Sequence, residues 1–123
     1  MNLLALAMWL MALMPGVRVH AIEGPVTVWR GIDTAGASVC WPDTRLAEVY
    51  YSPTLTANDS LGRTLSHELL HAVDCIDDGA FNGSPLAWHP DMSLSTDPAH
   101  SWVFWALAYP EQAVPIIEGI LLE

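Results

Sequence analysis

The first half of the chain alternates short apolar segments with turn-forming residues, a pattern that predicts a small β-sheet. Three segments have the β-branched and aromatic content typical of strands, and Gly, Pro and Asp separate them. These segments are Val26–Arg30, Ala37–Trp41 and Leu46–Pro53. We therefore expect three short strands ahead of the first long helix.

The second half predicts helices separated by one long loop. Leucines at helical spacing follow a capping residue, which predicts a helix from about Ser60 to Asp74. Ile76–Thr96 has no periodicity and is rich in Asp, Gly, Asn, Ser and Pro, and loops of this length are usually functional or mobile. An apolar helix over Asp97–Tyr109 and a weaker amphipathic helix over Glu111–Glu123 follow. The predicted fold class is α+β, with a small sheet, a helix, a long loop and C-terminal helices.

The N-terminal residues are more apolar than the rest of the chain. Leu3–Met14 is an uninterrupted apolar run, too short for an ordinary membrane-spanning helix of ~20 residues but suited to the core of a signal peptide. Pro15 and Gly16 end the run, and Ala21 provides a small residue for cleavage. We therefore expect residues 1–21 to form a signal peptide and residues 22–123 to form one domain. The alternatives are a buried first helix and a start codon further along the chain.

Composition and charge limit the partners of the protein. The chain has 123 residues, of which 52% are hydrophobic, so a single domain with a packed core is expected. Fourteen acidic residues against four basic ones give a net charge of −10. Nucleic acid and anionic membrane surfaces would repel this charge, so we expect neither as a partner. No feature of the sequence indicates an oligomeric state.

The two cysteines, Cys40 and Cys75, are compatible with either an oxidising or a reducing cellular compartment. In an oxidising compartment they could pair and close a long loop, which would stabilise the fold by ~3–4 kcal/mol. In a reducing cytosol they would be buried small apolar residues. A disulfide and a signal peptide would both indicate export, so we expect a secreted or periplasmic protein, with the cytoplasm as the alternative.

The segment HELLH, residues 67–71, predicts a metal centre. On a helix, His67 and His71 lie on one face, so both imidazoles can bind one zinc ion. Glu68 lies beside that face, where its carboxylate can take a proton from a metal-activated water as general base. Apolar residues surround the three side chains in the sequence, and burying two histidines and a glutamate without a partner would be unfavourable. The alternative is a helix whose polar side chains face solvent.

A catalytic zinc ion needs a third protein ligand, and four residues compete for this position. Asp74 is one turn past His71 and better suited to orienting a histidine. Asp77 lies ten residues after His67, and His89 lies in the long loop. His100 lies early in the predicted Asp97–Tyr109 helix, where packing could hold it rigidly. We favour His100, with Asp77 as the main alternative.

Two segments together resemble the gluzincin metallopeptidases, and in particular their lethal-factor-like branch. HELLHAVD (His67–Asp74) is similar to the HExGHAxD helix of that branch, and STDPAHSWVFWALAYPE (Ser95–Glu111) is similar to the helix that supplies its third ligand. The resemblance implies a zincin-like fold with zinc bound by His67 and His71, Glu68 as general base and Asp74 as a supporting acid. Our sequence has His100 where the family has a glutamate, and Leu70 where it has a glycine.

The predicted function is therefore zinc-dependent hydrolysis of peptide bonds in a peptide or protein substrate. The resemblance also implies that the strand before the active-site helix, here AEVYYS (Ala47–Ser52), is a sheet edge to which an extended peptide adds. The alternative function is a catalytically silent relative that keeps the fold and the metal as a binding or interaction module.

Overall fold

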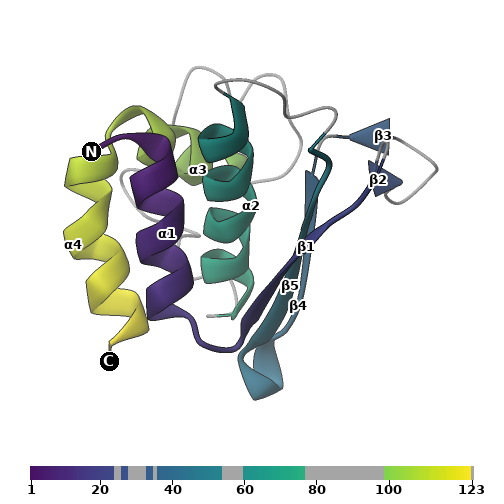
Figure 1. The fold of residues 1–123 in the computed structure, drawn as a ribbon. Helices are drawn as coiled ribbons and strands as arrows, with labels where there is room; N and C mark the ends of the chain where they lie inside the picture. Colours follow the sequence, from purple (N-terminus) through teal and green to yellow (C-terminus); the bar gives the residue numbers. More distant parts are fainter. Residues whose placement is uncertain (24–25, 28–32, 35, 54–59, 77–98, 123) are drawn as a thin grey trace.

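The protein folds into four α-helices and two small sheets, as seen in a computed structural model that describes residues 1–23, 26–27, 33–34, 36–53, 60–76 and 99–122 (Figure 1). The elements are α1 (Leu3–Leu13), β1 (Val17–Ala21), β2 (Val26–Thr27), β3 (Asp33–Thr34), β4 (Gly36–Trp41), the 3₁₀ turn η2 (Pro42–Thr44), β5 (Leu46–Tyr51), α2 (Ser60–Ile76), α3 (Ala99–Ala108) and α4 (Pro110–Leu121). The predicted α+β class is confirmed.

The larger sheet is mixed and has the strand order β1-β5-β4. β1 runs parallel to β5, with Val17 opposite Ala47, and β4 runs antiparallel to β5, with Gly36 opposite Tyr51. β2 and β3 form a separate antiparallel pair. The central strand of the larger sheet is therefore β5, which leads into the chain segment before α2.

The strand predictions are confirmed in part. β4 and β5 fall on the predicted segments Ala37–Trp41 and Leu46–Pro53. Of Val26–Arg30, only Val26–Thr27 forms a strand, in the small second sheet, and residues 28–30 lie outside the described part of the chain. The expectation that Ala47–Ser52 forms a sheet edge is wrong, because β1 occupies one side of β5 and β4 occupies the other.

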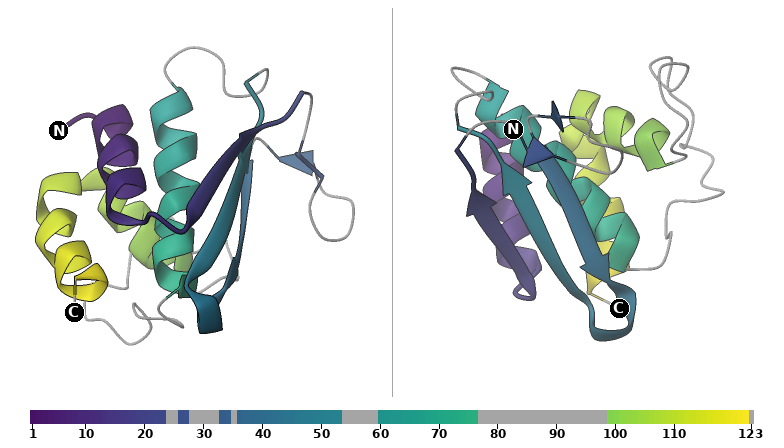
Figure 2. Two further views of the ribbon diagram at one scale, coloured as in Figure 1. Left: turned by 60° about the horizontal axis from the view of Figure 1, so that its bottom comes forward. Right: turned by 90° about the vertical axis from the view of Figure 1, so that its right-hand side faces the viewer.

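The helices lie together on one face of the sheet. α2 packs directly on β4 and β5, α1 packs on α2, and α4 lies beyond α1 (Figures 1 and 2). Side chains alternate along β5, so that Ala47 and Val49 are buried against the helices while Glu48 and Tyr50 are half-exposed on the other face. The buried apolar residues form one core: Leu6, Ala7, Leu10, Met14, Ala47, Val49, Leu65, Leu69, Leu70, Ala72, Val73, Ile76, Trp102, Val103, Ala106, Leu107, Ala113 and Ile117.

α1 is part of this core. The Asn2 side chain caps the helix by accepting a hydrogen bond from the Ala5 N–H at 2.7 Å, and Leu6 and Leu10 are fully buried. Burial of each leucine stabilises the fold by roughly 1.5–3 kcal/mol. Cleavage after Ala21 stays a prediction, and it would remove both α1 and β1 from the fold described here.

The crossing of α1 and α2 is close. A Cβ atom at Gly62 would lie 2.5 Å from the backbone nitrogen of Leu4, so only glycine leaves room for the α1 backbone at this point. One turn later, the buried Ser66 hydroxyl donates to the Leu3 carbonyl at 2.6 Å. These two α2 residues therefore match the surface of the first helix.

A disulfide between Cys40 and Cys75 joins β4 to the last turn of α2. The bond spans 35 residues of sequence, and closing such a loop stabilises the folded state by about 4 kcal/mol in the chain-entropy model. Disulfides persist in oxidising compartments, so the pairing is consistent with a location outside the cytoplasm. Among the helices that the structure describes, none is both long and apolar enough to span a membrane.

Candidate metal centre

His67 and His71 bring their ring nitrogens together on one face of α2. Their Nε2 atoms lie 3.2 Å apart, and the ring centroids are 4.8 Å apart. Two zinc ligands at ~2.0–2.1 Å in tetrahedral geometry are about 3.3 Å apart, so this separation fits one shared ion. It also fits a hydrogen bond from one imidazole to the other. The predicted pairing of the two histidines on one helix face is confirmed.

Glu68 completes the group. Its Oε1 atom lies 3.7 Å from the His67 Nε2 atom, and one ligand atom from each of the three residues falls within 4.8 Å of the others. This His67–Glu68–His71 group could hold a metal ion. The Glu68 side chain is only 10% exposed, and this burial raises the pKa of its carboxyl group to about 7. The carboxylate is therefore held close to the two histidines in a state that accepts a proton near neutral pH.

Two neighbours of the group carry no recognisable signal in the sequence. Phe104 of α3 lies against His67, with ring centroids 5.7 Å apart and the rings tilted by 57°. Gly36, the first residue of β4, lies against Glu68, since a Cβ atom there would be 3.0 Å from the Glu68 Cγ atom. A phenylalanine in an apolar helix and a glycine after a turn-forming segment are both common, so only the folded structure identifies their positions.

The structure describes only some of the candidates for the third ligand. His100 is in the first turn of α3, four residues before Phe104, although its side chain lies outside the described part of the structure. Asp74 is half-buried on α2, one turn after His71. Asp77 and His89 lie outside the described residues. The identity of the third ligand therefore stays a prediction.

Burial of Glu68 gives the metal-free protein a specific pH dependence. The folded state holds the Glu68 proton between about pH 4.5 and about pH 7 and the unfolded state does not, so stability should fall as pH rises through this range. At ~1.4 kcal/mol per pH unit, the loss amounts to about 3 kcal/mol. We expect Glu68→Gln to match the wild type at about pH 4 and to be more stable by about this amount at about pH 8. Urea unfolding in the presence of a chelator measures both values.

The exposed Glu118 of α4 provides the control for this measurement, because Glu118→Gln makes the same chemical change far from the buried group. A stability difference between wild type and Glu68→Gln that is equal at both pH values would contradict the raised pKa. The chelator is necessary because a cation beside the carboxylate favours its ionised form.

A second polar cluster lies on the opposite face of the sheet. The Tyr50 hydroxyl donates to the Glu48 Oε2 atom at 2.7 Å, and the His20 Nε2 atom is 3.5 Å from the Glu48 Oε1 atom. The Tyr50 hydrogen bond, with His20 and Arg18, lowers the pKa of Glu48, and the same bond raises the pKa of Tyr50. The cluster joins β1 to β5 and is separated from the His67–Glu68–His71 group by the sheet.

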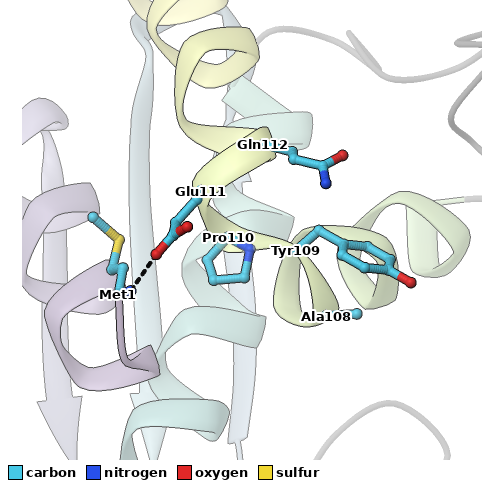
Figure 3. A pocket seen from close by; sticks show the side chains of 6 residues that line it. All are labelled: Met1, Ala108, Tyr109, Pro110, Glu111 and Gln112. Atoms are coloured by element: carbon cyan, nitrogen blue, oxygen red, sulfur yellow. Dashed lines mark hydrogen bonds and ion pairs between the residues drawn. The ribbon is translucent and has the colours of Figure 1, made fainter.

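A pocket of about 290 Å³ lies where α1 begins beside the junction of α3 and α4 (Figure 3). The Met1 amino group forms an ion pair with Glu111 at 2.7 Å on its wall, while Tyr109 and Gln112 point away from Met1. A smaller pocket of about 190 Å³ lies between the end of α1 and the ends of α2 and α4. Neither of these two pockets is lined by His67, Glu68 or His71.

Comparison with known proteins adds no relative: no family model, no curated protein and no solved structure matches the chain. The fold and the site therefore define the class as a small α+β protein with a group on α2 that could hold a metal ion.

Proposed function

We propose that the protein is a zinc-dependent metallopeptidase in which His67 and His71 hold the ion and Glu68 is the general base. The observation that carries this proposal is the 3.2 Å separation of the two Nε2 atoms beside a buried carboxylate. A bound zinc ion supplies a Lewis acid that acidifies water and polarises a carbonyl group. The same three residue types at the same spacing occur in the gluzincins, which the sequence resembles.

The environment of Glu68 suits a general base. A catalytic base must be ionised to accept a proton; burial raises the pKa of Glu68 to about 7 in the metal-free protein, and a bound cation would favour the ionised carboxylate. From its place 3.7 Å from the His67 Nε2 atom, the carboxylate can take a proton from an attacking water and pass it to the leaving amine. This assigns the proton transfers to one side chain.

His100 is our proposed third ligand. Residues four apart lie on the same face of a helix, so His100 shares a face of α3 with Phe104, the residue that contacts His67. The contact between Phe104 and His67 supports this choice, because it shows that α3 packs on α2 beside one of the two proposed ligands. Asp77, directly after the end of α2, is the alternative ligand.

We propose a peptide or protein substrate, because an edge strand of the sheet could bind an extended peptide beside the candidate metal centre. Among the described strands, β4 is at an edge of the larger sheet, and it begins at Gly36 beside Glu68. An extended peptide that added to β4 would lie next to the carboxylate. We propose a secreted or periplasmic location, which the Cys40–Cys75 disulfide supports, with the cytoplasm as the alternative.

The proposal predicts one zinc ion per chain and metal-dependent peptide cleavage. Purified protein should contain zinc in a one-to-one ratio and cleave an unfolded protein substrate, and a chelator should abolish cleavage until zinc is restored. Metal analysis and mass spectrometry of the products measure both. Zinc without cleavage would support the silent metal-binding relative instead, and protein that binds no zinc would overturn the metal centre.

A further inference from the structure

Gly36 occupies an unusual place for a glycine. It is the first residue of β4, and its backbone is outside the left-handed region, so the main-chain conformation does not require glycine. Glycine weakens a strand, because it packs no side chain and loses more conformational freedom on folding. The reason for glycine must therefore be the space around it.

That space is filled by α2. A Cβ atom on Gly36 would lie 3.0 Å from the Glu68 Cγ atom and 3.1 Å from the Thr64 Cγ2 atom. It would also lie 3.1 Å from the Tyr50 carbonyl oxygen, which belongs to the central strand and cannot easily move. Thr64 branches at its own Cβ atom and is stiff on a helix, whereas Glu68 has free torsions. A methyl group at position 36 would therefore displace the Glu68 side chain first.

α2 cannot avoid such a group by sliding along β4. Cys40 is four residues after Gly36 on the same face of the strand and is bonded to Cys75. Four strand residues span about 13 Å, and the nine helical residues from the midpoint of Thr64 and Glu68 to Cys75 span about 13.5 Å. The disulfide at one end and the Gly36 contact at the other thus fix α2 in register with β4.

We propose that Gly36 is a positioning residue for Glu68: its missing side chain lets the Glu68 Cγ atom pack against β4, which holds the carboxylate beside His67. The catalytic part of this inference rests on the proposed function, in which that carboxylate is the general base. The packing part rests only on the contacts among Gly36, Thr64 and Glu68.

Gly36→Ala tests the catalytic part. We expect kcat for peptide cleavage to fall by about tenfold or more with little change in KM. The reason is that the methyl group shifts the Glu68 carboxylate away from the position in which it can accept the proton of the attacking water. Zinc affinity should change by less than about threefold, since the three heavy atoms nearest to the added methyl group belong to Glu68, Thr64 and Tyr50, which are not the proposed ligands. A fall in zinc affinity as large as the fall in kcat would overturn the proposal.

Two other glycines provide matched controls. Gly62→Ala places a methyl group on the Leu4 backbone and should lower stability while kcat per folded molecule stays within about twofold of wild type. Gly119→Ala meets nothing within 4 Å and should leave both kcat and folding intact. If Gly62→Ala lowers kcat per folded molecule as much as Gly36→Ala, the role of Gly36 is merely structural and the proposal fails.

A double-mutant cycle tests the packing part without any enzymatic activity. The loss of unfolding free energy caused by Gly36→Ala is measured in wild type, in Glu68→Ala and in Thr64→Ala. We expect Glu68→Ala to remove at least about half of this loss, because it deletes the Cγ atom that the methyl group meets. An equal loss in the wild-type and Glu68→Ala backgrounds, or relief by Thr64→Ala alone, would overturn the proposal.

The double-mutant cycle tests the contact between Gly36 and Glu68 independently of the proposed peptidase function. If the protein cleaves no peptide, the proposed function fails, while relief of the Gly36→Ala loss by Glu68→Ala still establishes the contact. If Gly36→Ala alone does not fold, the double variant Gly36→Ala/Glu68→Ala is expected to fold. Failure of that double variant to fold would also overturn the proposal.

Discussion

Replacing Glu68 by glutamine is expected to lower peptide cleavage by ~10²–10⁴-fold while zinc stays bound, since this is the usual contribution of a general base. Glutamine keeps the size of the side chain and its packing against Gly36, but its amide cannot take a proton at neutral pH. The two ring nitrogens that we assign to the metal belong to His67 and His71 and are unchanged. The measurement is a steady-state assay at matched zinc occupancy.

The exposed Glu118→Gln variant controls for the chemical change, and it should cleave at the wild-type rate. Cleavage by Glu68→Gln within about threefold of wild type would contradict the general-base role. Loss of zinc from Glu68→Gln would instead identify the carboxylate as a ligand. The geometry permits this role, because one carboxylate oxygen of Glu68 lies within 4.8 Å of the ligand nitrogens of His67 and His71.

The sequence predicts the site helix well because all of its information is local. Leucines at helical spacing and the i, i+4 histidines are properties of α2 itself, and α2 runs over Ser60–Ile76, close to the predicted bounds. β4 and β5 are likewise recognisable from β-branched and aromatic content between turn residues. Elements whose signal lies within their own residues can be read from one sequence.

The N-terminal elements could not be predicted in the same way. An apolar run of this length meets the needs of a signal peptide and of a buried helix equally, so Leu3–Met14 alone does not distinguish them. The residues that pack on α1 lie some sixty residues away, at Gly62 and Ser66, so no local pattern announces them. The expectation that β5 is an edge strand came from the family resemblance, and the pairing of β5 with β1 corrects it.

The residues around the candidate site could not be predicted either, because tertiary packing alone brings them there. Phe104 and Gly36 meet His67 and Glu68 only because α3 and β4 pack on α2. The pairing of Cys40 with Cys75 depends on β4 lying beside the end of α2, and the sequence left it open. The His67–Glu68–His71 group was thus predictable from the sequence, whereas the residues packed against it were not.

The ligand substitutions are expected to separate the three histidines by the size of their effects. His71→Ala should lower zinc affinity by roughly 10²-fold or more, because it removes one of the two nitrogens that are 3.2 Å apart. His100→Ala should lower it by about tenfold or more, as loss of a third ligand from a neighbouring helix requires. Competition with a chromophoric chelator measures each affinity.

The contrast between His100 and Asp77 decides the third ligand. We expect Asp77→Asn to change zinc affinity by less than about threefold, and His20→Ala, on the far face of the sheet, to behave the same way. If Asp77→Asn has the large effect and His100→Ala the small one, the ion is held by α2 and the segment after it, and α3 contributes only the Phe104 wall. If both have large effects, zinc has four protein ligands and no open position for water, which is the arrangement of a structural site and would favour the silent relative over the peptidase.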